Sequence, residues 1–235
     1  MKLIIIITIV FCSGYFFSIT ALGSTITIII MTVCSLAIVF MAILRKKRNP
    51  QETLLIDRKT LALTTYQVTI VIMLSGISSV SIKQVVLCCC AMLIVSVYDW
   101  HNFKIIYIKV MAVISCFSLF GFAVQHSSLI NLLPTIVNYN GIEYINGILF
   151  SIIKYKYSDP TERLHGLFWE PGLFATYLAI AIIFINRENT KRYWLTLVLF
   201  VVCLIMTKSG AGIAMMPLIL ISKLTEKRNI EFSLI

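Results

Sequence analysis

Three side chains able to bind an anion or exchange a proton lie close together near the middle of the chain: Arg163, His165 and Glu170. A guanidinium can hold two oxygens of an anion at once, and a carboxylate or an imidazole can accept a proton. An apolar run at residues 173–185 follows directly and is typical of a membrane span. Ionisable groups at a bilayer interface are costly, so this cluster predicts a functional site.

The helix expected after the cluster would position it. Pro171 stands where the first turn should begin, and its missing N–H costs nothing there because first-turn amides have no partner within a helix. Glu170 would then lie beside the positive end of the helix dipole, which favours its ionised form. The site is therefore expected at one end of a membrane helix.

The same stretch resembles a signature of bacterial O-antigen polymerases and the related O-antigen ligases. The matching residues are Arg163-x-x-Gly166-x-Phe168-Trp169-Glu170-Pro171-Gly172-x-Phe174-Ala175-x-Tyr177-Leu178. Further on, Thr207-Lys208-Ser209-Gly210-Ala211-Gly212 resembles the Thr-x-Ser-x-Gly segment that follows one helical hairpin later in that family. The likeness covers residues 163–217, the polymerase- or ligase-like segment.

The resemblance implies a membrane glycosyltransferase that joins lipid-linked oligosaccharides outside the cytoplasm. Such an enzyme expels a lipid diphosphate from an anomeric carbon while a sugar hydroxyl attacks. Arg163 is expected to neutralise the leaving group, and Glu170 or His165 to take the proton. Trp169 and Lys208 are the further substrate-binding candidates. Family members are regarded as independent of metals and nucleotide sugars, so no metal and no cofactor is expected.

Each candidate also has a structural interpretation. Arg163 can serve as a headgroup anchor and Glu170 as a first-turn residue that complements the helix dipole. His165 can be a surface histidine, and Trp169 can belong to the aromatic belt at the membrane interface. Lys208 can be a further anion contact beside Ser209.

The composition indicates an integral membrane protein. Hydrophobic residues make up 59% of the chain and charged residues 13%, with a mean hydropathy of +0.95, whereas soluble domains carry about 25% charged residues. The net charge of +10 lies in short clusters between apolar runs, as the positive-inside rule requires, so nucleic acid is not an expected partner. The seven cysteines lie inside apolar runs, which disfavours a metal or disulfide site.

The apolar runs predict a single all-α, polytopic membrane domain over residues 1–235 with about eight transmembrane helices. A signal peptide is the alternative for the first run. One longer extracytoplasmic loop is expected at residues 125–163, with short interfacial or re-entrant pieces at 129–137 and 145–153. Residues 99–104 are expected to be a polar loop, and 167–171 to extend the sixth helix at its start. The predicted spans are 3–20, 26–44, 61–77, 85–98, 105–124, 173–185, 193–206 and 213–222.

The charges also predict an orientation. With a cytoplasmic N-terminus, 15 lysines and arginines fall in inner loops and five in outer segments. This arrangement places residues 125–163 and the Glu170 end of the sixth span outside the cytoplasm. The expected location is therefore the bacterial inner membrane, in a multi-pass topology.

The leading hypothesis is an O-antigen or capsular polysaccharide repeat-unit polymerase that uses an undecaprenyl-diphosphate-linked oligosaccharide. Expected partners are membrane lipids, a chain-length regulator and a flippase. The alternatives are an O-antigen ligase, whose acceptor is lipid A–core, and a non-enzymatic polysaccharide or ion transporter. Because polymerases of the resembled family usually continue past the Thr-x-Ser-x-Gly hairpin, the sequence also predicts a shortened member or a fragment.

Overall fold

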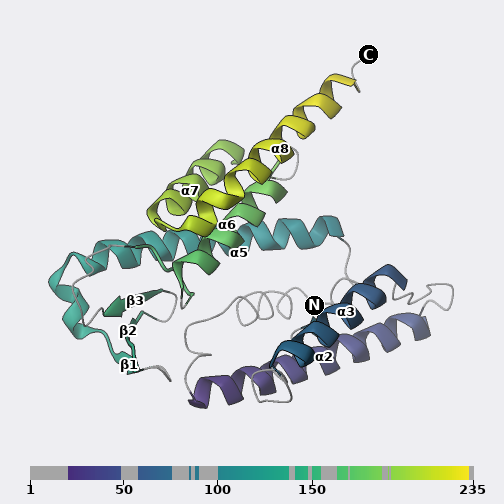
Figure 1. Ribbon diagram of the computed structural model, residues 1–235, viewed down its shortest axis with the longest axis horizontal. Helices are drawn as coiled ribbons and strands as arrows, with labels where there is room; N and C mark the ends of the chain where they lie inside the picture. The colour runs from purple at the N-terminus through teal and green to yellow at the C-terminus, as the bar shows by residue number, and fades with distance from the viewer. Residues whose placement is uncertain are drawn as a thin grey trace. The chain divides into compact units, whose positions relative to one another are not determined.

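The computed structural model describes residues 21–48, 58–75, 85, 88–89, 100–137, 141–147, 150–154, 163–168, 170–186, 190 and 192–232 (Figure 1). Most of these residues are helical, as predicted. The chain divides into two compact units: Met1–Cys12 with Ala21–Ile106, and Ser13–Thr20 with Tyr107–Ile235. The candidate site belongs to the second unit.

The first unit contains helices α2 (Ala21–Arg48) and α3 (Arg58–Ser75). They contain most of the spans predicted at 26–44 and 61–77. The buried residues of α2 recur at intervals of three and four, as on one face of a helix, and include Met31, Cys34 and Ile38. The span predicted at 3–20, and nearly all of that at 85–98, lie outside the described residues.

Within the described chain, α5 (Trp100–Gln125) is the helix long and apolar enough to cross a membrane. It contains the span predicted at 105–124. The predicted count of eight spans is not confirmed, because the apolar segments in the other described helices are only 10–17 residues long. These shorter segments are Thr25–Phe40, Pro171–Phe184, Tyr193–Met206 and Gly210–Lys223.

The polar loop expected at residues 99–104 is wrong, because α5 begins at Trp100. The Trp100 and Phe103 rings stack with centroids 5.5 Å apart, and the Lys104 ammonium lies 5.4 Å from the centre of the Trp100 ring. Side chains three and four residues apart meet on a helix surface. These contacts stabilise a first turn where the residue types alone favour a loop.

A three-stranded antiparallel sheet follows α5 and corrects the all-α expectation. Strand β1 (Thr135–Val137) pairs with β2 (Glu143–Asn146), which pairs with β3 (Ser151–Lys154). The register sets Thr135 opposite Ile145 and Ile145 opposite Ile152. A 3₁₀-helix, η2 (Ser128–Leu132), connects α5 to the sheet.

The pieces expected at 129–137 and 145–153 as interfacial or re-entrant have a defined structure: the first contains most of η2 and all of β1, and residues 145–153 contribute to two paired strands. Phe150 stabilises this arrangement. Its ring lies where a side chain on Gly121 of α5 would be, and it meets Phe120 edge-on at 6.0 Å. The core beneath the sheet consists of Val124, Ile145, Phe150 and Ile152, with Ile130 and Leu133 against it.

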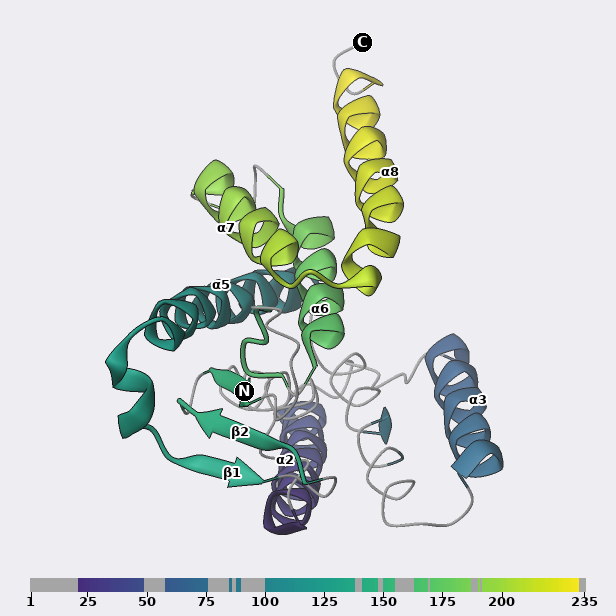
Figure 2. The same cartoon turned by 60° about the vertical axis from the view of Figure 1, so that its left-hand side comes forward.

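Helix α6 (Pro171–Phe184) packs against both α7 (Tyr193–Met206) and α8 (Gly210–Phe232), as Figure 2 shows. The Tyr107 hydroxyl of α5 donates to the Tyr177 carbonyl of α6 at 3.1 Å. No residue of α6 is exposed: one side of the helix is half-buried, and the residues of the other side are buried, namely Pro171, Phe174, Ala175, Leu178, Ala179, Ala181 and Ile182. α6 is therefore the central helix of this group.

Pro171 occupies the first turn of α6, as predicted, but residues 167–170 do not extend the helix. Glu170 is extended, with φ −141° and ψ 134°, because the residue before a proline avoids the helical region. Helix α8 begins at Gly210 and continues through Pro217 to Phe232. It is longer than the broken span predicted at 213–222.

Candidate functional site

The segment at residues 163–170 is a compact turn that connects the sheet region to α6. The Phe168 amide donates to the His165 carbonyl at 3.1 Å. Gly166 has a φ of +62°, in the left-handed region that glycine adopts readily. A β-carbon at this position would lie 2.8 Å from the Ser118 hydroxyl of α5, so the turn requires glycine for its backbone angle and for space.

Hydrogen bonds fix this turn on two sides. The Ser151 amide of β3 donates to the Gly166 carbonyl at 2.7 Å, and the Ser151 hydroxyl lies 3.2 Å from that oxygen and 3.1 Å from the Phe168 carbonyl. The Leu164 amide donates to the Met206 carbonyl, at the end of α7, at 3.0 Å. The turn is thereby tied to both the sheet and the helices.

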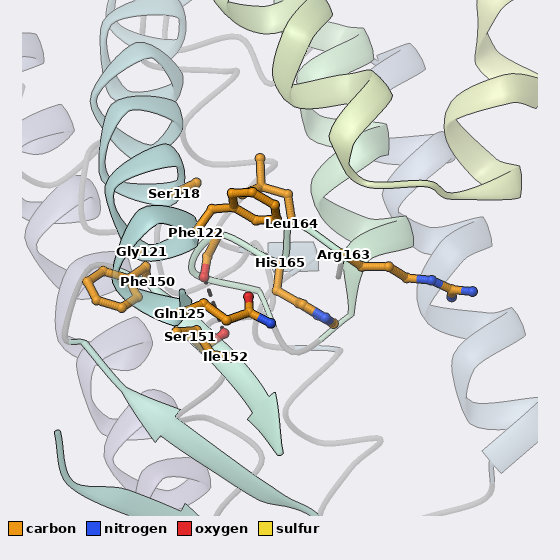
Figure 3. A pocket seen from close by; sticks show the side chains of 11 residues that line it. Ser118, Gly121, Phe122, Gln125, Phe150, Ser151, Ile152, Arg163, Leu164 and His165 are labelled. Carbon is orange, nitrogen blue, oxygen red and sulfur yellow. Dashed lines mark hydrogen bonds between the residues drawn. The ribbon is translucent and has the colours of Figure 1, made fainter. Parts of the chain in front are cut away.

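A small pocket lies between the turn, β3 and the end of α5 (Figure 3). Its space is about 10 Å³, which is the room needed for a single water molecule and far too little for a sugar ring. Figure 3 shows the Arg163 guanidinium extending away from this pocket. The polar residues that border it are Ser118, Gln125, Ser151, Arg163 and His165.

His165 is 4% exposed, so the surface-histidine interpretation is wrong. Burial, and then the positive charge of Arg163, lower the pKa of His165 from 6.5 to about 4. The imidazole is therefore uncharged at neutral pH. Two buried nitrogens, Nδ1 of His165 and Nε of Arg163, have no hydrogen-bond partner among the described residues.

The second predicted segment, residues 207–212, connects α7 to α8. Thr207 is buried, and Lys208 is exposed and has a φ of +46°, the left-handed conformation in which the chain reverses. The Ser209 hydroxyl accepts a hydrogen bond from the Ala211 amide at 3.2 Å. Ser209 therefore caps the N-terminus of α8, because it satisfies an amide that has no partner within the helix.

The starts of α6 and α8 lie against one another. A β-carbon on Gly172 would lie 3.4 Å from the Ser209 hydroxyl and 3.7 Å from Oε1 of Glu170. A β-carbon on Gly212 would lie 3.3 Å from that of Ala175. Glycines on both helices thus permit a close approach, and two N-termini with their unpaired amides and partial positive charge meet at one place.

The structure places the candidates in two environments. Arg163 is half-buried and His165 buried, both beside the pocket, whereas Glu170 and Lys208 are exposed near the paired helix starts. Glu170 precedes the first helical residue, but its side chain makes no capping hydrogen bond. Trp169 lies outside the described residues. The two sequence segments are therefore close in space, by way of the Gly172–Ser209 approach and the Leu164–Met206 hydrogen bond.

Three residues that the sequence did not single out, Ser118, Gln125 and Ser151, complete the surroundings of His165. Ser118 is inside an apolar span, and Ser151 is inside a short apolar run, so neither has a local signal. Among the residues that the structure describes, no group of three His, Cys, Asp or Glu side chains is arranged to hold a metal ion.

Comparisons with models of protein families, with curated protein sequences and with solved structures found no match to this chain.

Proposed function

We propose that the protein is a polysaccharide repeat-unit polymerase of the O-antigen polymerase type. In this proposal it spans the inner membrane several times. It transfers a glycan from an undecaprenyl-diphosphate carrier to a lipid-linked acceptor at the outer face. The observation that supports it best is the contact of residues 163–172 with residues 207–212, because the two segments that carry the resemblance lie against one another although 34 residues separate them in the sequence.

The reaction requires a site for a diphosphate as it leaves. The acceptor hydroxyl oxygen attacks the anomeric carbon, the bond from that carbon to the diphosphate oxygen breaks, and the diphosphate departs with the electron pair. Arg163, on the turn before α6, and Lys208, beside the paired starts of α6 and α8, are the candidates for positive charge, and the helix starts add amide donors. Fixed donors of this kind stabilise charge that develops in the transition state.

The acceptor proton needs a base that a sugar can reach. Glu170 is exposed at the start of α6, whereas His165 is almost completely buried beside a pocket the size of a water molecule. We therefore assign the proton to the Glu170 carboxylate. We assign to His165 the role of holding the turn that carries Arg163, as an uncharged neighbour that does not repel the guanidinium.

Deletion of the gene tests this function and separates it from the sister activity. Polymerase loss should leave single repeat units attached to the cell surface, visible on a gel as the collapse of a glycan ladder to one band. Loss of a ligase would instead leave no attached glycan. An unchanged ladder would contradict both activities and favour a transporter or another membrane role.

A further inference from the structure

The 3₁₀-helix η2 has three distinct faces. A 3₁₀-helix has three residues per turn, so side chains three positions apart lie above one another. Ser128 and Asn131 form a polar face. The other two faces are apolar: Ile130 with Leu133, which follows the helix directly, and Leu129 with Leu132.

The two apolar faces have different surroundings. Ile130 and Leu133 pack against the core beneath the sheet. Leu129 is 52% exposed and Leu132 79% exposed, so the described residues of the second unit leave both largely uncovered. Two leucines stacked in this way on a short helix form an apolar edge that points out of the protein.

η2 follows the apolar C-terminal half of α5 along the chain, after Gln125, His126 and Ser127. The outward residues on the C-terminal half of α5 include Val113, Phe117 and Phe120, which are 53%, 39% and 57% exposed. No Asp, Glu, Lys or Arg occurs between Lys109 and Glu143, so no charged side chain separates the helix from η2. A surface of this composition is compatible with lipid and costly to expose to water.

We propose that Leu129 and Leu132 insert into the outer leaflet of the bilayer where α5 leaves it. This inference rests on the membrane location and orientation given under the proposed function. η2 then lies in the interface, with its inner face on the protein and its leucine edge among acyl chains. Since Ser151 of β3 binds the 163–168 turn, the anchored sheet fixes the depth of Arg163 relative to the lipid headgroups.

Fluorescence quenching in proteoliposomes tests the insertion. Single cysteines are placed at positions 132, 131 and 113 of a cysteine-free full-length chain and labelled with an environment-sensitive dye. Quenching by two lipids, one with a spin label near its headgroup and one with a spin label deep in its acyl chain, is compared with quenching by aqueous iodide. Position 131 is the matched control on the polar face of the same helix, and position 113 reports whether α5 itself contacts lipid.

Insertion predicts that the dye at 132 is quenched several-fold more by the labelled lipids than the dye at 131, with the reverse order for iodide. If the dye at 113 were quenched by lipid but the dyes at 131 and 132 were quenched equally, the anchor would be overturned. The membrane location would stay intact. Absence of lipid quenching at 113 would overturn the membrane location itself. Protection of 132 from both quenchers, with cross-linking to a second copy, would show a protein contact and overturn the anchor.

Discussion

The His165 imidazole is held without charge because its surroundings offer no solvent and because the Arg163 guanidinium is near. Burial contributes most to the lowered pKa, and the positive charge adds to it. A protonated imidazole here would also repel the group on which anion binding is expected to depend. The protonation state of His165 therefore affects both the stability of the fold and the net charge of the candidate site.

Folding is expected to weaken as the pH falls from about 6.5 towards about 4, the unfolded and folded pKa values of His165. In this window the unfolded chain binds a proton that the folded chain does not, so the free energy of unfolding falls. Above the window both states are neutral and the effect disappears. His165→Gln should remove on the order of 1 kcal/mol or more of this pH dependence.

The check is the thermal unfolding midpoint of purified protein in detergent, measured at neutral pH and at the acid end of the window. His126→Gln is the matched control, because His126 is exposed. If the unfolding midpoints of wild type and His165→Gln fell equally with pH, the fold would not be holding this imidazole neutral.

Gly166 and Gly141 both have a positive φ, so the effects of replacing each of them by alanine can be compared. Their φ values are +62° and +74°, but only Gly166 has neighbours within 4 Å of an added β-carbon, notably the Ser118 hydroxyl at 2.8 Å. Gly141→Ala should cost about 1 kcal/mol for the left-handed conformation. Gly166→Ala should cost about 1–3 kcal/mol more, because it overpacks the contact with α5.

Unfolding midpoints of the two variants measure this difference directly. Equal losses would indicate that the turn does not approach α5 as closely as 2.8 Å. Replacement of Ser118 by Gly in the Gly166→Ala chain should recover part of the additional loss, since it removes the nearest atom.

Among the elements, β3 has an importance that its length of four residues does not indicate. Its first residue, Ser151, uses both its amide and its hydroxyl on the turn that carries the candidate site. A short strand thereby restrains residues 166–168, which precede α6.

Ser151→Ala should loosen that turn while leaving the helices intact. Loss of a buried hydroxyl that contacts two carbonyls is expected to cost about 1–3 kcal/mol. Hydrogen exchange should become faster in a peptide that covers residues 163–170 and stay unchanged in Tyr193–Met206. Ser127→Ala, which removes a local bond to Val124, is the control and should leave both peptides unaffected. Unchanged exchange at 163–170 in Ser151→Ala would argue against the restraint.

The elements also differ in how far the sequence predicts them. The bounds of α7 agree with the prediction, and α6 begins at Pro171 as expected, because a long apolar run or a first-turn proline is a local signal. The sheet has no such signal. Short apolar runs suit strands, helices or interfacial pieces alike, and what favours pairing here is the distant contact of Phe150 with Gly121.

The candidate site, too, was predictable only where the local sequence carries a signal. Arg163, His165 and Glu170 could be selected from their residue types and spacing within one segment. The surroundings of His165 could not, because Ser118 and Ser151 come from different elements and are ordinary residues in their local sequence. The burial of a histidine depends on packing that spacing does not specify.

For the whole molecule, the proposed orientation rests on the distribution of lysine and arginine. Single cysteines introduced at positions 140 and 189 of a cysteine-free chain should therefore label oppositely. A membrane-impermeant thiol reagent applied to cells with a permeabilised outer membrane should reach position 140 and spare position 189. Labelling at 189 in intact cells would reverse the orientation and remove the site from the outer face.

The central claim is that residues 163–172 and 207–212 together bind a lipid diphosphate and support glycan transfer. The most direct measurement is chain elongation of an undecaprenyl-diphosphate-linked repeat unit by the purified protein in proteoliposomes. Wild type should yield products of several repeats, Arg163→Ala none, and Arg163→Lys a reduced amount, because lysine keeps the charge but lacks the planar fork. Elongation by Arg163→Ala at the wild-type rate, or none by correctly inserted wild type, would contradict the account.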